Sequence, residues 1–201
     1  MKKLTLVLAV AMMAIATTAS AQFVNGGTRS SMVADTENYS RLELGYSPVA
    51  VEKTDLTGLS LGWTKGISLT QDIPLFLEVG ANVMYSFGEK YDVETSMLSL
   101  NVPVTMAWKF APTESISIIP HAGLNLRGHI LGTQSFDDEE DYDLFDSDEG
   151  DGKRFNVGGT VGLAVNFNKF MVGLGYTFDF NETWEETDKL NYLTISIGVK
   201  F

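Results

Sequence analysis

The feature that most constrains this chain is a strict alternation of apolar and small polar residues in long runs. At the C-terminus, Leu193, Ile195, Ile197, Val199 and Phe201 share one parity, and Thr, Ser, Gly and Lys residues take the other. Successive side chains of a strand point to opposite faces of a sheet. The run therefore predicts a strand with one apolar face and one face of small polar groups.

Eight such runs follow one another along the chain. They predict strands at residues 39–47, 57–69, 74–86, 97–110, 115–131, 154–167, 170–180 and 189–201. Short turns follow the second, fourth and sixth strands, and longer loops follow the first, third, fifth and seventh, which is typical of a transmembrane barrel. Pro103 and Pro120 fall inside strands and cannot donate to the ladder, so each predicts a bulge or a local break.

The N-terminus is typical of a secretory signal peptide. Lys2 and Lys3 precede an apolar run, and a small-residue cleavage site ends at Ala21, before Gln22. We therefore expect a signal peptide at 1–21, a loose polar lead at 22–37 and one barrel domain at 38–201. An uncleaved membrane anchor is the disfavoured alternative. The chain has no cysteine, which excludes both a lipid-attachment site and disulfides.

Charge and hydropathy narrow the class of protein further. Loss of the two lysines with the leader would change the formal charge from −12 to −14, which argues against binding to nucleic acid. After the leader, no run of about 18 apolar residues could form a membrane helix. A membrane location would therefore require a closed barrel, in which every backbone group is hydrogen-bonded.

The polar face of the predicted strands decides between a membrane barrel and a soluble lipocalin-like carrier. A face in bulk water normally carries many charges, whereas this one is rich in glycine, serine, threonine and asparagine. The apolar face carries almost no charge, and its aromatic residues fall near predicted strand ends, as two interfacial girdles would require. The predicted fold is all-β: an eight-stranded antiparallel up-and-down transmembrane β-barrel with its polar face inward.

Several segments support a family resemblance. Residues 100–110 (LNVPVTMAWKF), 120–123 (PHAG), 156–167 (NVGGTVGLAVNF) and 172–176 (VGLGY) resemble the outer-membrane β-barrel domain family, often labelled porin-family or PorT-like and common in the Bacteroides group. The resemblance spans essentially the whole mature chain, and its architecture is similar to the small OmpX and OmpA barrels. It implies a Gram-negative cell outer membrane, with the terminal Phe201 completing the signal that the barrel assembly machinery reads.

The polar parity also contains ionisable residues, which would lie inside the barrel. Buried charges must be paired, so we expect an internal network of salt bridges and hydrogen bonds with Glu78 and Arg127 as its central members. The expected network comprises Arg41, Glu43, Glu78, His121, Arg127 and Asp179. Eight strands leave a lumen that side chains fill, so a structural plug is favoured over a gated ion path.

Two other site hypotheses are weaker. Catalysis by a membrane-embedded lipid A or peptide hydrolase would need a nucleophile and a base together, but His121 and His129 are about 26 Å apart on one strand. The stretch 137–151 holds ten carboxylates and only faintly resembles a calcium-binding loop. A solvated external loop is the better interpretation, and no metal site or cofactor is expected.

The sequence therefore predicts a monomeric, non-enzymatic outer-membrane barrel with a structural or surface-interaction role. Its expected partners are outer-membrane lipid, lipopolysaccharide and the barrel assembly machinery. A small ion or solute channel is the main alternative function.

Overall fold

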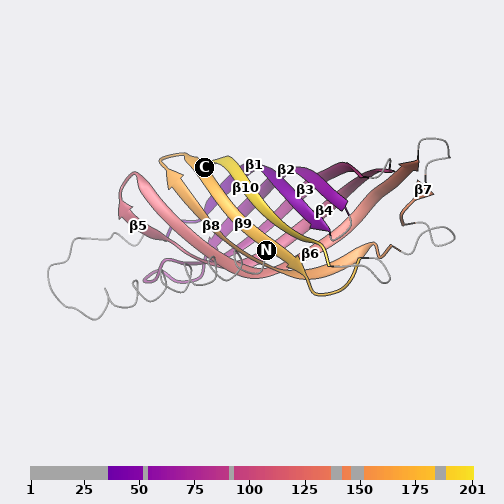
Figure 1. Cartoon of the computed structure of the whole chain (residues 1–201). Coiled ribbons are helices and arrows are strands. Elements are labelled where there is room, and N and C mark those ends of the chain that lie inside the picture. Colours follow the sequence, from indigo (N-terminus) through magenta and orange to yellow (C-terminus); the bar gives the residue numbers. More distant parts are fainter. Residues whose placement is uncertain (1–35, 52–53, 91–92, 137–141, 146–151, 184–188) are drawn as a thin grey trace, which may run out of the picture. The chain divides into compact units, whose positions relative to one another are not determined.

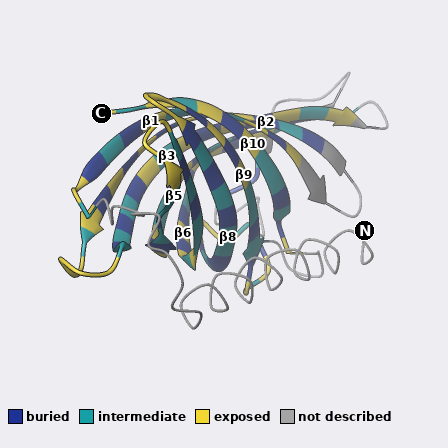
Figure 2. Cartoon of the chain, turned by 90° about the vertical axis from the view of Figure 1, so that its left-hand side faces the viewer, coloured by how far each residue is buried: buried dark blue, intermediate teal, exposed yellow. Residues whose placement is uncertain are grey.

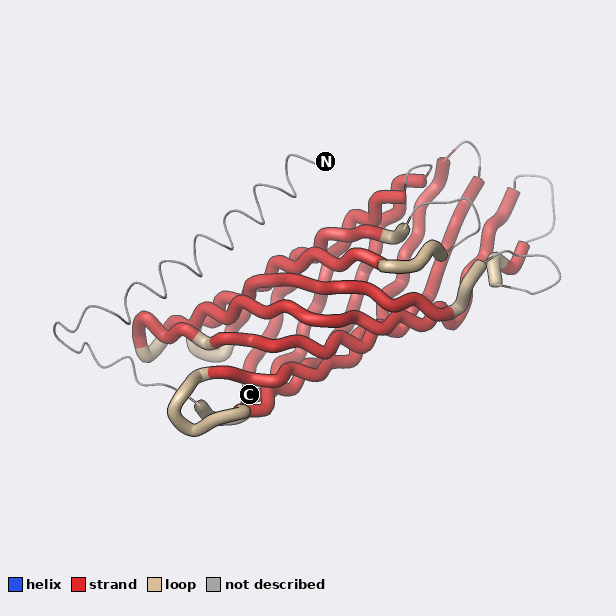
Figure 3. Tube along the Cα trace, turned by 90° about the horizontal axis from the view of Figure 1, so that it is seen from below, coloured by secondary structure: helices blue, strands red, loops and turns tan. Residues whose placement is uncertain are grey.

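The computed structural model describes residues 36–51, 54–90, 93–136, 142–145, 152–183 and 189–201. The predicted signal peptide, nearly all of the polar lead and most of the acidic loop lie outside these residues. Within them, no helix is long and apolar enough to cross a membrane. Figure 3 shows only strands and connecting loops in the described chain.

The described chain forms one antiparallel sheet that closes on itself. The strands are β1 (Tyr39–Val51), β2 (Thr54–Ser68), β3 (Leu75–Lys90), β4 (Val93–Trp108), β5 (Phe110–Thr113), β6 (Ile116–Phe136), β7 (Tyr142–Asp143), β8 (Phe155–Phe167), β9 (Phe170–Asp179) and β10 (Asn191–Lys200). Neighbours follow the order β4-β3-β2-β1-β10-β9-β8-β6, and pairing of β4 with β6 closes the barrel (Figure 1). The short β5 and β7 both pair with β6.

The eight long strands confirm the predicted fold, but the expected long loops after the first and third strands are wrong. β1 continues to Val51 and β2 resumes at Thr54, while β3 continues to Lys90 and β4 resumes at Val93. In these extensions the backbone ladder persists although the apolar alternation has faded. The end of the barrel with these extensions is called the loop end, and the end with Phe201 is called the turn end.

Alternation sorts the side chains as predicted. Apolar residues on the outer face are well exposed, for example Leu44 at 59 % and Leu61 at 53 %. Polar and charged residues of the other parity are buried inside, including Thr64, Glu78 and Asn125. Dark and light segments consequently alternate along the strands in Figure 2. A lipocalin-like barrel would have the opposite arrangement, so the soluble alternative is wrong.

The two prolines are accommodated where a ladder hydrogen bond is not needed. Pairing between β3 and β4 is interrupted opposite Pro103 and resumes in the same register, from Val79↔Val104 to Asn82↔Asn101. Pro120 lies in β6 between the residues that pair with β5 and those that pair with β4. The β5 ladder includes Ile118, and the β4 ladder ends at the pair Ala107↔His121. The register shift in the β4–β6 ladder lies elsewhere, at Leu98/Ser99.

Candidate functional site

The first group of buried charges lies near the turn end and is centred on Glu78. Its carboxylate accepts hydrogen bonds from Arg41 Nη1 at 2.6 Å, Tyr39 Oη at 2.5 Å and Thr105 Oγ1 at 3.1 Å. Strands bring these side chains together because β1 pairs with β2, β2 with β3, and β3 with β4. Such charge-assisted bonds satisfy a carboxylate that water does not reach.

Two further predicted residues belong to this Glu78 cluster. Glu43 accepts from Arg41 Nε at 2.6 Å, so one guanidinium bridges two carboxylates. Its other oxygen accepts from Ser196 Oγ at 3.3 Å. His121 Nδ1 lies 4.0 Å from Glu78 Oε2. The cluster thus joins Arg41, Glu43, Glu78 and His121, together with Tyr39 and Thr105.

The second group of buried charges is nearer the loop end and is centred on Arg127. Arg127 Nη1 donates to Asp179 Oδ2 at 2.8 Å, and both side chains have 0 % exposure. Arg127 Nε donates to Asn101 Oδ1 at 3.0 Å, and the guanidinium lies 4.7 Å from the centre of the Tyr192 ring. Asn156 Nδ2 also donates to Asp179 Oδ2, at 3.3 Å. These residues form the Arg127 cluster.

The parity of the residues predicts one network around Glu78 and Arg127, whereas the structure places these two residues in separate clusters. The clusters also contain neutral hydrogen-bond partners outside the predicted network, among them Tyr39, Asn101 and Asn156. Parity put each of them on the lumen face. Their cross-strand neighbours depend on register, which a single sequence does not show.

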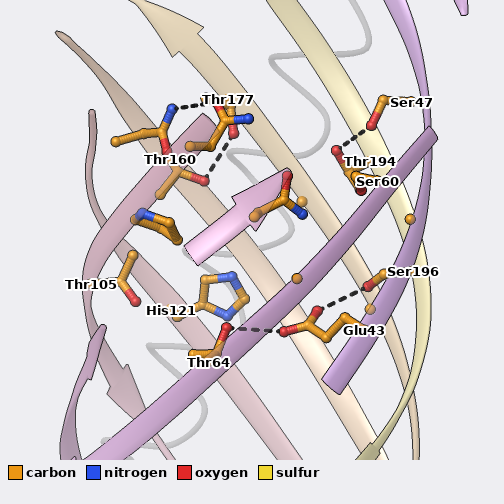
Figure 4. Close-up of a pocket in the computed structure, with 18 of the residues that line it drawn as sticks. Glu43, Ser47, Ser60, Thr64, Thr105, His121, Thr160, Thr177, Thr194 and Ser196 are labelled. Carbon is orange, nitrogen blue, oxygen red and sulfur yellow. Dashed lines mark hydrogen bonds between the residues drawn. The ribbon is translucent and has the colours of Figure 1, made fainter. Parts of the chain in front are cut away.

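A cavity of about 130 Å³ occupies the lumen between the two clusters, and many of its lining residues carry hydroxyl groups. Hydroxyl groups dominate the part drawn in Figure 4, where Thr160 contacts Thr177 at 3.1 Å and Ser47 contacts Thr194 at 2.7 Å. Glycines leave the space open: a Cβ on Gly175 would have its nearest neighbour 4.0 Å away. We call this cavity the chamber.

Apolar layers lie beyond the chamber at both ends of the barrel. At the turn end the buried residues are Tyr39, Phe76, Ala107, Ile119, Ala164 and Met171. At the loop end they are Leu56, Met84, Met97, Leu144, Phe145, Leu190 and Tyr192. These layers and the two buried ion pairs place side chains across the lumen on both sides of the chamber, in keeping with the small diameter of an eight-stranded barrel.

Leu144 and Phe145 are the part of the loop-end layer that does not come from the barrel wall. They follow β7, which pairs with the end of β6 (Figure 1). Leu144 N donates to Gly132 O at 3.0 Å, and the Phe145 ring stacks on His129 with centroids 5.0 Å apart. Only 4 % of Phe145 is exposed. The acidic composition of 137–151 predicts a solvated loop for this pair, whereas the structure buries both residues.

A contact that the sequence analysis missed joins Ser99 to His129. Ser99 Oγ lies 2.9 Å from His129 Nδ1, a separation compatible with a nucleophile and its base. Both side chains are buried, however, and the Phe145 ring stacks on that of His129. Among the described residues no carboxylate bonds to His129, and no group of three or more potential ligands could hold a metal ion.

The backbone of the terminal residue, Phe201, is hydrogen-bonded within the sheet, whereas its ring is exposed. Phe201 N donates to Ser40 O at 2.9 Å, and Ser40 N donates to Phe201 O at 2.8 Å. The residue is nevertheless 70 % exposed. The backbone of Phe201 therefore helps to close the barrel, while the ring contributes little to internal packing.

Comparison with known families identifies the class of protein. Residues 5–201 match the outer membrane protein β-barrel domain. The chain belongs to this family. No curated protein matches the sequence.

Solved structures agree in fold. Neisserial surface protein A is 13 % identical with a TM-score of 0.55, and the match covers 81 % of this chain and 95 % of that one. The outer membrane enzyme PagL is 17 % identical with a TM-score of 0.53, covering 79 % and 98 %. At such identities the likeness concerns the fold alone. Family and fold together locate the protein in the outer membrane of a Gram-negative cell.

Proposed function

We propose that this outer-membrane barrel has a structural or surface-interaction role and that its lumen does not conduct ions. The observation that carries the proposal is the filling of the lumen at two levels. Near the turn end the Arg41–Glu78 pair lies beside a buried apolar layer. Near the loop end Arg127–Asp179 lies beside a second such layer, since Arg127 packs on the Tyr192 ring. An ion would have to displace buried, paired charges to pass, which is costly.

Planar-bilayer recording of the purified protein tests the closed lumen. We expect insertion to produce no steady conductance above that of the protein-free membrane. Correct folding of the same sample is checked by heat-modifiable migration on gels. A large, steady conductance from folded protein would contradict the proposal and favour the channel function.

A small-solute channel is the second candidate function, and the chamber is the observation that favours it. Many hydroxyl groups line the chamber, together with the Glu78 cluster and with Asn101 and Tyr192 of the Arg127 cluster. Its loop-end cover includes Leu144 and Phe145, which come from a segment outside the barrel wall. Displacement of those two side chains would remove the part of that cover that does not belong to the barrel wall.

We also propose that the protein is not an enzyme. Ser99 and His129 are the best-placed nucleophile and base, but both are buried and the Phe145 ring stacks on His129. Nε2 of His129 has no hydrogen-bond partner in the described chain. An orienting carboxylate and an open space for substrate, both needed for hydrolysis, are lacking around this pair among the described residues.

The proposed partners are lipid, lipopolysaccharide and the assembly machinery, with the barrel acting as a monomer. The exposed apolar belt supports lipid contact, because residues such as Leu44, Leu61 and Ile197 would otherwise face water. The free ring of Phe201 supports a recognition role for the last residue, since its burial inside the protein is slight.

Replacement of Phe201 by alanine tests that recognition role. We expect a several-fold lower amount of folded protein in the outer membrane, with an unchanged urea midpoint for protein refolded in vitro, because the ring packs little against the barrel. Phe170→Ala is the matched control, since Phe170 is 71 % exposed at the same end. Equal losses from both variants would mean that the terminal position carries no special signal.

A further inference from the structure

A surface groove lies outside the barrel, where β3, β4 and β6 approach the loop end. It has a volume of about 340 Å³, and its lining includes Tyr85, Phe87, Glu89, Glu94, Ser96 and Thr133. Its walls are paired strands, so side chains rather than free backbone groups would contact a ligand.

The groove begins where the apolar belt ends. The row Tyr85↔Leu98↔Leu131 is apolar or aromatic. One row further, Phe87 faces Ser96 and Thr133, and the next row joins Glu89, Glu94 and Ser135. A change from leucine to carboxylate over two rows marks the boundary between lipid and water. The groove is therefore within reach of molecules outside the cell.

The two carboxylates of this groove lie directly opposite each other. Glu89 and Glu94 are cross-strand partners, and both are exposed. Like charges in such positions destabilise a strand pair. In the described part of the chain, neither carboxylate has an ion-pair partner. A positive group placed between them would remove the repulsion.

Aromatic faces lie next to the carboxylates. Tyr85 and Phe87 are stacked with centroids 5.7 Å apart, and they are 47 % and 41 % exposed. The face of an aromatic ring attracts an ammonium or guanidinium group. The hydroxyls of Ser96 and Thr133, 2.9 Å apart, supply oxygen acceptors for its N–H groups.

We propose that this groove binds a lysine- or arginine-bearing segment of a partner polypeptide. The inference rests on the proposed surface-interaction role and deepens it by naming the partner's chemistry. The net charge of the chain, −12 with its leader, attracts basic partners over long range. It repels sulfated glycans, and an uncharged glycan would leave the two carboxylates unpaired.

Binding of a fluorescent peptide of alternating lysine and serine residues tests the proposal. The full-length mature barrel is held in nanodiscs of uncharged lipid, and fluorescence anisotropy reports binding. We expect the double variant E89Q/E94Q to bind about tenfold more weakly, and Phe87→Ala about threefold more weakly. The matched control is D72N/E114Q, which removes two exposed charges from turns at the other end and should change affinity less than about twofold.

Several results would overturn this assignment. Absence of binding to the wild-type barrel, or equal weakening by the two double variants, would show that the groove does not bind a basic segment. Preference for an uncharged oligosaccharide over the peptide would identify a glycan site instead. Heat-modifiable migration confirms that each variant is folded. A failed peptide experiment leaves the conductance result unchanged, so failure of the groove and failure of the closed-lumen proposal are distinguishable.

Discussion

Replacing Asp179 with asparagine is expected to lower the free energy of unfolding of the barrel by about 3–5 kcal/mol. Asp179 and Arg127 are both fully buried and 2.8 Å apart. Within the described residues Arg127 has no second carboxylate at ion-pair distance. The asparagine variant would therefore leave a buried guanidinium without a compensating charge, which is much costlier than loss of an exposed pair.

Glu43→Gln is the matched control for this prediction. Glu43 is 20 % exposed at its side chain, and Arg41 would keep its second partner, Glu78, at 2.6 Å. We expect this variant to cost only about 1 kcal/mol. Urea titration of protein refolded into vesicles, followed by tryptophan fluorescence, measures both values. Similar costs for the two variants would show that Asp179 is not the essential partner of Arg127.

The barrel could be predicted because the alternation of residues along each strand shows which side chains lie on the apolar face and which on the polar face of the sheet. The parity of Leu42 and Leu44 against Arg41 and Glu43 assigns each side chain to lipid or lumen, and the structure confirms the assignment. The same signal fades beyond the apolar belt. For that reason the predicted first strand ends at Ser47, although backbone pairing continues to Val51.

The clusters inside the lumen were much harder to predict, because they depend on register. Arg127 meets Asp179 across 52 residues, through β6, β8 and β9. Alternation shows that both side chains face the lumen, but it does not show that they lie at the same level along the barrel axis. Ser99 and His129 are opposite each other only after a register shift beside Leu98. A single sequence contains no direct signal for such a shift.

Leu144 and Phe145 are an instructive exception, since a signal for them was present. Two adjacent apolar residues interrupt a stretch with ten carboxylates between 137 and 151. Apolar side chains in such a setting gain free energy by leaving water, and the open end of a barrel is the nearest place to do so. The acidic composition of the loop concealed this pair from an analysis based on average polarity.

The second large effect is expected from Phe145→Ala, which should expose the chamber to reagents in water. Truncation of a buried phenylalanine typically costs 3–5 kcal/mol. Phe145 makes these packing contacts only when it covers the loop end, where its ring stacks on His129 beside Leu144. The substitution therefore weakens the closed arrangement. If the segment opens reversibly, a loss of about 3 kcal/mol raises the open population by about a hundredfold.

A single cysteine can report this opening, because the natural chain has none. Ser60 lines the chamber and is 8 % exposed, so Ser60→Cys places a thiol there with little change in volume. We expect a small, charged thiol reagent to modify it slowly in the otherwise unchanged barrel and up to about a hundredfold faster when Phe145→Ala is added. Phe180→Ala is the matched control: Phe180 is 50 % exposed on the barrel, and its loss should leave the rate unchanged. Rapid modification with Phe145 in place would mean that the chamber is already open, and the channel function would then be the better explanation of this lumen.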